Sequence, residues 1–235
     1  MNRFLFLLAL SGTPVLADGS VFYPPQGCTG YLSVQQANCK VSHYWTCEQD
    51  PQGVQWRADL GRGAVTFVGK IDAEAQWLES YDFSPIRQSN LSLPATDPAS
   101  LTELLGTGVD SFDFIIVDPE TRVRTRVVGY DRIVERDVTV DGEPLHRTEF
   151  SVRFVNPGSD TAHMEVSGNE YVSATHRRFF GGPRTHTSGG RTTRADSSPV
   201  DFLYPGEDGF FAKTPLYGCS LDMASLSEPA RGPKP

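Results

Sequence analysis

The amino-acid sequence predicts a mainly β protein, built as one large antiparallel curved sheet, or half-barrel, of about ten strands with one short helix near 98–106. Apolar and polar residues alternate along several stretches, turn signals separate these stretches at even intervals, and a single stretch has helical periodicity. Of the 235 residues, 38% are hydrophobic and 11% aromatic, so the chain can bury a sizeable core. A sandwich and a closed barrel fit the same pattern, which leaves open whether the sheet closes.

Alternation with period two marks the predicted strands. Val41, His43 and Trp45 share one face of a strand, whereas Ser42 and Tyr44 share the other. Similar alternation occurs at 54–60, 75–83, 112–117 and 146–154. Clusters of Asp, Asn, Gly and Pro separate such stretches at 50–53, 61–63, 118–120, 141–144 and 156–158. This arrangement is typical of half-buried strands joined by short turns.

One stretch fits a short helix inserted between strands. Asp97 has the side chain of an N-cap, Pro98 suits the first helical position, and Gly106 ends the stretch. Its apolar face comprises Leu101, Leu104 and Leu105. Such a helix covers an open face of the sheet or, as the alternative, closes an apolar cavity inside the curved sheet. The aromatic residues predicted to fill the core or line such a cavity are Tyr44, Trp45, Trp56, Phe67, Trp77, Tyr81, Phe112 and Phe114.

The first 17 residues have the features of a secretory signal peptide. Arg3 supplies a positive start, 4–10 form an apolar stretch, and Ala17 ends a run of small residues suited to cleavage. The sequence therefore predicts a periplasmic or secreted protein that begins after Ala17. A single β-rich domain is expected over 18–224, followed by a flexible tail, 225–235, rich in Pro, Gly and Ser.

Four cysteines fall in the predicted mature chain, and an even number in an exported protein indicates two disulfides. Their spacing does not fit a zinc site, which needs close Cys-x-x-Cys pairs. A hairpin that turns near Ala37 would place Cys28 opposite Cys47 and leave Cys39 for Cys219. The other two pairings remain open from the sequence.

Composition excludes some classes of function. A formal net charge of -8 argues against a general nucleic-acid binder. No apolar run reaches the roughly 18–20 residues of a membrane-spanning helix. Neither a histidine metal-ligand spacing nor a Gly-x-Ser-x-Gly nucleophile motif occurs, so we predict no metal, no cofactor and no catalytic residue. Asp131, Glu135 and Asp137 share one face of a predicted strand, which favours a solvated face over an acid–base pair.

The segment 175–194 is strongly basic within an otherwise acidic chain and contains no acidic residue. It is predicted to form a hairpin that either pairs with carboxylates on the sheet or binds an anionic ligand or protein. The candidate binding residues are Arg177, Arg178, Arg184, His186, Arg191 and Arg194.

Several short runs carry a resemblance to a protein family. They are Cys39-x-Val41-Ser42-His43-x-Trp45-x-Cys47, Gln55-Trp56-Arg57, Ile71-Asp72, Gln76-Trp77-x-Glu79-Ser80, Gly129-Tyr130-Asp131-Arg132, Ser198-Pro199-Val200 and Pro205-Gly206. Through these runs the chain resembles uncharacterised exported proteins of alphaproteobacteria, which implies a Gram-negative periplasm and transfers no activity. In architecture alone, the expected fold resembles the half-barrel of periplasmic lipoprotein carriers.

These observations lead to a periplasmic binding module for a lipid or another apolar ligand as the leading hypothesis. The first alternative is an interaction protein that uses the basic 175–194 segment on an anionic or protein partner. The second is a hydrolase whose catalytic Ser, His and Asp come together only on folding.

Overall fold

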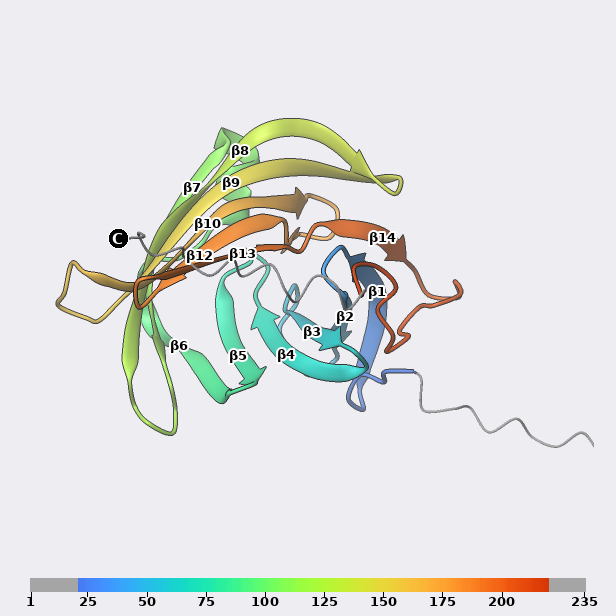
Figure 1. Cartoon of the computed structure of the whole chain (residues 1–235), viewed down its shortest axis with the longest axis horizontal. Coiled ribbons are helices and arrows are strands. Elements are labelled where there is room, and N and C mark those ends of the chain that lie inside the picture. Colours follow the sequence, from blue (N-terminus) through green and yellow to red (C-terminus); the bar gives the residue numbers. More distant parts are fainter. Residues whose placement is uncertain (1–20, 220–235) are drawn as a thin grey trace, which may run out of the picture.

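The computed structural model describes residues 21–219 and shows fourteen strands in one sheet with one short helix (Figure 1). The predicted mainly β fold with a large antiparallel curved sheet is therefore confirmed. The signal peptide at 1–17 and the tail at 225–235 lie outside the described residues.

The strands and the helix follow one another along the chain with short connections. They are β1 (Cys28–Gln36), β2 (Lys40–Cys47), β3 (Gln55–Gly61), β4 (Ala64–Ile71), β5 (Trp77–Phe83), β6 (Ile86–Asp97), α1 (Leu101–Thr107), β7 (Val109–Val117), β8 (Arg124–Val140), β9 (Glu143–Val155), β10 (Ala162–Ser173), β11 (Arg178–Phe180), β12 (Pro183–Ser188), β13 (Arg191–Asp196) and β14 (Pro199–Leu203).

The prediction of about ten strands was too low. Strand β13 is exposed at every position, and its sequence shows no alternation of apolar and polar residues. Strand β6 has no buried position and carries Pro94 within its length. Strands of this kind form because their neighbours offer backbone partners, and the alternation on which the prediction depended is weak in them.

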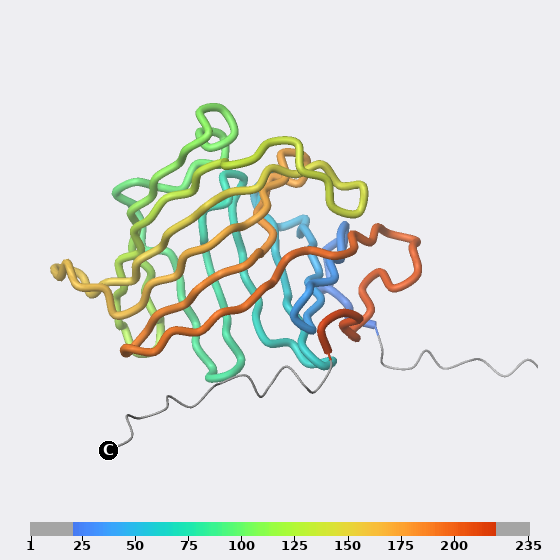
Figure 2. Tube along the Cα trace, turned by 45° about the horizontal axis from the view of Figure 1, so that its top comes forward, coloured from blue at the N-terminus to red at the C-terminus, as the bar shows by residue number. Residues whose placement is uncertain are grey.

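The sheet is a meander, since almost every strand pairs with its neighbours in the chain. The order runs from β13 through β12, β10 and β9 down to β1, and ends at β14. Strands β13 and β14 therefore lie at opposite ends of the order, although only Ser197 and Ser198 separate them in the chain. Ser197 N donates to Gly182 O, and Ser198 O accepts from Ala37 N. The chain that leaves β13 at one end of the strand order therefore continues directly into β14, which pairs with β1 at the other end (Figure 2).

The helix α1 forms, but its ends differ from the prediction. Its N-cap is Ser100, whose Oγ accepts from Glu103 N at 3.2 Å, and its C-cap is Gly108 at φ 90°. Asp97 instead ends β6 and accepts from Ser111 Oγ, while Gly106 lies inside the helix. The predicted N-cap and stop were wrong because Ser100 caps the helix one turn later.

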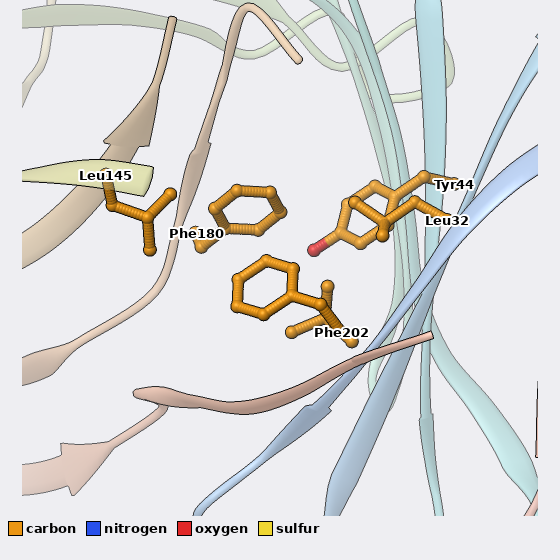
Figure 3. Close-up of a cluster of buried hydrophobic side chains, with 6 residues drawn as sticks. Leu32, Tyr44, Leu145, Phe180 and Phe202 are labelled. Atoms are coloured by element: carbon orange, nitrogen blue, oxygen red, sulfur yellow. The ribbon is translucent and has the colours of Figure 1, made fainter. Parts of the chain in front are cut away.

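Three apolar clusters lie on the concave face of the sheet, which we call the inner face. The first joins β1, β2, β9, β11 and β14, whose side chains point toward one another (Figure 3): Leu32, Val34, Tyr44, Leu145, Phe180 and Phe202. The second comprises Phe112, Phe114, Val127, Phe150 and Val152. The third packs α1 against the sheet through Ala75, Leu101, Leu104 and Val172. The apolar face of α1 is thus buried against the sheet.

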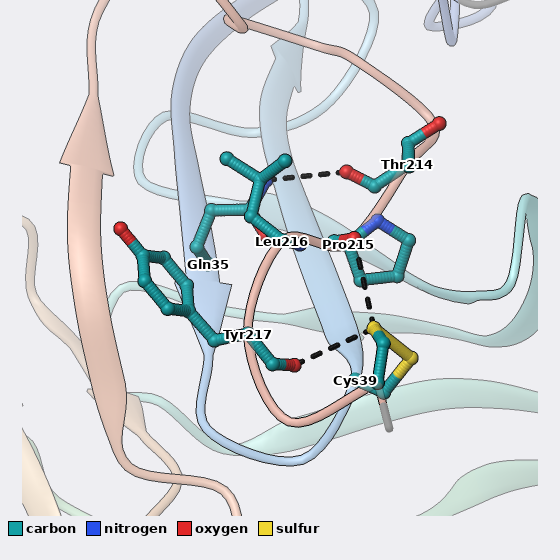
Figure 4. Close-up of a disulfide and its surroundings, with 7 residues drawn as sticks. Gln35, Cys39, Thr214, Pro215, Leu216 and Tyr217 are labelled. Carbon is teal, nitrogen blue, oxygen red and sulfur yellow. Dashed lines mark hydrogen bonds between the residues drawn. A yellow bond between two sulfur atoms is a disulfide. The ribbon is translucent and has the colours of Figure 1, made fainter. Parts of the chain in front are cut away.

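Both disulfides form in the preferred pairing, which confirms that prediction. Cys28 bonds to Cys47 across the β1–β2 hairpin, and Cys39 bonds to Cys219 over 180 residues (Figure 4). The second bond holds the C-terminal segment 211–219 against the convex face of β1, which we call the outer face. In addition, Gln35 Oε1 accepts from Leu216 N on this face. Within 21–219, no helix is long and apolar enough to cross a membrane.

Candidate functional site

The outer face of β2 and β3 carries a pair of indole rings. Trp45 and Trp56 are opposite each other in the register of the two strands. Because side chains alternate along a strand, both lie on the face opposite to Tyr44 and Arg57. Their rings are within 3° of parallel, with centroids 6.3 Å apart. The two strands thus place two parallel indole rings side by side on the outer face.

Charged neighbours hold the second indole in position. Trp56 Nε1 donates to Asp50 Oδ2 at 2.7 Å, and Lys70 Nζ lies 4.8 Å from the ring centroid. Lys70 Nζ is also 2.8 Å from Asp50 Oδ1 and 3.2 Å from Glu79. Burial alone raises the pKa of Asp50, but hydrogen bonds from Lys70 and Trp56 outweigh it and lower the pKa. Asp50 therefore stays ionised at neutral pH and fixes the orientation of Trp56.

A pocket with a volume of about 520 Å³ lies against these rings. Its other wall is the chain from Phe22 to Gly27, which precedes β1. Its lining comprises Phe22, Tyr23, Pro25, Gln26, Gly27, Cys28, Trp45, Cys47, Gln49, Asp50, Trp56 and Val68. We call it the Trp pocket. Its volume lies within the range of small-molecule sites, and its lining is mostly apolar with a few polar groups.

Covalent and backbone bonds position the walls of the Trp pocket. The Cys28–Cys47 disulfide joins β1 to β2 beside the rings. Phe22 N donates to Phe211 O at 2.8 Å, which ties the N-terminal wall to the segment held by Cys219. Both walls are therefore fixed before any ligand arrives, and a pre-formed site loses less entropy on binding.

One polar group in the wall has no partner. Trp45 is 3% exposed, and its buried Nε1 has no acceptor among the described residues. Buried tryptophan N–H groups normally donate a hydrogen bond. Trp45 thus differs from Trp56, whose Nε1 has a carboxylate acceptor.

The predicted basic residues do not form a single patch. Arg177 lies by α1, where its Nη2 is 2.8 Å from Glu74 Oε1. Arg178 is buried, with 3% of its surface exposed. Arg184 and Arg194, together with Gly168, Pro183, Thr185, Ala195 and Asp196, line a pocket of about 350 Å³. His186 pairs in register with Val166 and Thr193, and Arg191 with Ser188 near the β12–β13 turn. Only two of the six residues line a common pocket.

The predicted carboxylates on β8 are also separated. Register shifts between Ile133 and Val138 interrupt the alternation, and Glu135 forms an ion pair with Arg147 at 2.9 Å. Asp137 is exposed, whereas Asp131 is half-buried. The expected common solvated face is therefore wrong, because the bulges turn Asp131 away from the other two carboxylates.

Asp131 belongs instead to an acidic group on the inner face. It lies opposite Asp110 of β7 in the register, and Glu170 of β10 is the third member. Burial, together with Glu170 and Asp110, raises the pKa of Asp131 to about 8. Burial, with smaller contributions from Glu103, Asp97 and Glu74, raises the pKa of Asp110 to about 6. Burial raises the pKa of Glu170 to about 7, although Arg184 and Arg57 oppose the shift. Within 21–219, no group of three or more His, Cys, Asp or Glu side chains is arranged to hold a metal ion.

Comparison with known proteins leaves the site to be interpreted from its geometry. No protein-family model matches the chain, and no curated protein or solved structure matches it.

Trp45 and Trp56 were predicted to belong with the other core aromatics, so the Trp pocket was not predicted from the sequence. A signal was nonetheless present: both indoles alternate with Tyr44 and Arg57, and a Phe-Tyr-Pro-Pro run precedes β1. That pattern indicates a second layer of chain on the outer face. It does not reveal that a space remains between the layers.

Proposed function

We propose that the protein is an exported binding module that takes an apolar, ring-bearing molecule into the Trp pocket. The observation that carries this proposal is the pair of nearly parallel indoles on one wall of a mostly apolar pocket of about 520 Å³. Aromatic side chains in the wall of a pocket favour ring-containing ligands, because ring–ring contacts contribute beyond the burial of area.

Polar groups around the pocket would orient such a ligand. Gln26 and Gln49 are exposed side chains of the lining and offer both donors and acceptors. Apolar burial supplies the affinity, while a few placed polar groups supply the orientation.

Export is part of the same proposal. Two disulfides join all four cysteines, and such bonds persist in oxidising compartments such as the periplasm. The predicted signal peptide and the resemblance to exported alphaproteobacterial proteins agree with this location.

The test uses N-phenyl-1-naphthylamine, a neutral aromatic probe whose emission increases in apolar surroundings. We expect a saturable rise in directly excited probe emission with the wild-type protein. Gln49→Trp fills the pocket from an exposed position and should weaken binding at least about tenfold, because the ring can no longer be buried. Gln52→Trp is the matched control, since Gln52 is exposed and does not line the pocket.

The three proteins give distinguishable results. Unchanged binding by Gln52→Trp together with loss in Gln49→Trp supports the Trp pocket as the site. Equal affinity in all three, or a probe signal that never saturates, contradicts the proposal.

A further inference from the structure

Arg178 is a buried cation on the inner face, on the side of β2 opposite to the Trp pocket. It begins β11 and pairs in register with Ser173. Its side chain crosses to β2, where the guanidinium carbon lies 3.8 Å from the centroid of the Tyr44 ring. With 3% of its surface exposed, Arg178 is among the most buried charged residues of the described chain.

Only one part of this guanidinium is hydrogen-bonded. Nη1 donates to Tyr31 Oη at 2.9 Å and to Gln55 Oε1 at 3.1 Å. Nε is buried and has no partner, and no described hydrogen bond involves Nη2. The guanidinium plane of Arg178 makes a cation–π contact with the Tyr44 ring. Neither this contact nor the two neutral acceptors neutralises the charge of Arg178.

The hydrogen bonds and ion pairs described for Glu143 do not include Arg178. Glu143 Oε1 lies 3.3 Å from His176 Nε2, and Glu143 Oε2 accepts from Tyr204 Oη at 2.6 Å. Burial, with a contribution from nearby Arg178, outweighs Glu143 and lowers the pKa of His176. His176 is therefore neutral at pH 7, and no ion pair of Arg178 occurs among the described residues.

Arg126 shows how a guanidinium of this chain binds a carboxylate. Its Nε donates to Asp113 Oδ1 at 2.8 Å and its Nη2 to Asp113 Oδ2 at 2.6 Å. This two-pronged geometry matches carboxylate and phosphate groups. Arg178 has the same Nε–Nη2 edge without an acceptor, although a buried charge needs one far more than the half-exposed Arg126 does.

We infer that the Nε–Nη2 edge of Arg178 binds an oxyanion, the carboxylate or phosphate group of a small molecule, inside the curved sheet. Tyr31 and Gln55 act as positioning residues, because their bonds to Nη1 leave this edge free for the ligand. Tyr31, His176 and Tyr204 beside it are only half-buried, so the site lies one side chain below the surface. The site is separate from the Trp pocket, since Tyr44 and Trp45 point to opposite faces of β2.

The experiment measures the thermal unfolding midpoint as chloride is replaced by inorganic phosphate or by acetate at constant ionic strength. A ligand that binds only the native state raises the midpoint as its concentration rises. We expect a rise with at least one of the two oxyanions for the wild-type protein and for Arg126→Gln. In Arg178→Lys, which keeps the charge but loses the two-pronged edge, the apparent affinity should fall at least about tenfold.

An NMR measurement on the wild-type protein keeps the inference testable if the variants fold poorly. With ¹⁵N-labelled arginine, the Nε–H resonance of Arg178 should shift on addition of phosphate or acetate, while that of Arg126 should stay in place. A further arm with dihexanoyl phosphatidic acid below its micelle concentration distinguishes a lipid headgroup from a free anion as the source. Midpoints and Nε–H shifts that do not respond to any of these oxyanions would overturn the inference, even if the probe binds the Trp pocket.

Discussion

The two faces of β2 and β3 are both buried, yet they differ in chemistry. On the outer face, Val41 and Leu60 are apolar and fully buried beneath the terminal segments. On the inner face, Ser42 Oγ donates to Asp59 Oδ1 at 2.6 Å, and Arg57 Nε lies 3.1 Å from the same oxygen. The two faces therefore do not differ in how deeply their side chains are buried. The difference arises because the outer face is sealed by a second layer of chain, whereas the inner face meets other strands of the same sheet.

This contrast suggests two kinds of binding on one sheet. The apolar outer layer leaves a pocket against two indoles, which suits a ring. The polar inner face leaves a guanidinium edge without an acceptor, which suits an oxyanion.

Removal of the long disulfide should have the largest effect, because it holds the second layer against the outer face. Cys39→Ser/Cys219→Ser opens a loop of 180 residues and should cost up to about 5 kcal/mol of unfolding free energy. Cys28→Ser/Cys47→Ser opens a loop of 19 residues and should cost about 3 kcal/mol. Urea denaturation measures both values. An equal loss in the two variants would show that the outer layer does not depend on its covalent anchor.

Truncation of one leucine on each face tests whether the outer layer is packed as tightly as the inner core. Leu60 and Leu32 are both 0% exposed. We expect Leu60→Ala and Leu32→Ala each to cost about 2–5 kcal/mol, measured by urea denaturation, because each leaves a cavity. A cost below about 1 kcal/mol for Leu60→Ala would mean that the terminal segments only lie loosely on the sheet.

Acid should destabilise the outer layer through His43, whose ring stacks against both Phe22 and Phe211. Burial lowers the pKa of His43 from 6.5 to about 4, so the fold favours the neutral ring. Its contribution is present above pH 6.5 and is lost as the pH falls through 4, by roughly 3 kcal/mol. His43→Gln should flatten the pH dependence of unfolding in this window. His163→Gln, at an exposed position, is the control and should leave the slope unchanged.

The inner face should have the opposite pH dependence. The folded-state pKa of Asp131 is about 8, above its usual 3.8, so its contribution is present below pH 4 and is lost as the pH rises to 8. Asp131→Asn should therefore stabilise the protein at pH 8 relative to pH 4, on the order of 1 kcal/mol because water reaches the half-buried carboxyl. Asp137→Asn, at an exposed position of the same strand, should show no such difference in chemical denaturation. A matching gain in both variants would contradict an unfavourable buried charge at Asp131.

Local patterns in the sequence were enough to predict much of the sheet. Alternation identified β2, β3 and β9, and the β1–β2 hairpin correctly placed Cys28 opposite Cys47. The ends of α1 were misplaced because Asp97 joins strand β6 and leaves the N-cap to Ser100. Strand β13 has no apolar side, so only its backbone partners define it.

The candidate sites were harder to predict because they depend on which side chains meet. Arg177 and Arg178 are adjacent in the sequence, yet one forms an ion pair with Glu74 and the other is buried against Tyr44. From the sequence they were predicted to belong to one basic patch. Nothing in the composition shows that a turn places two adjacent residues in different surroundings. The Trp pocket likewise depends on the terminal segments that cover the outer face.

Native mass spectrometry of the protein purified from a Gram-negative periplasm without detergent tests the central proposal most directly. We expect a mature chain four hydrogens lighter than its reduced form, because two disulfides are present. The native wild-type protein should carry the extra mass of an apolar ring-bearing molecule, recovered in an organic extract. That mass should persist in Gln52→Trp and be absent from Gln49→Trp. A bare native mass for all three proteins, with no ring-bearing molecule in the extract, would contradict a ligand in the Trp pocket.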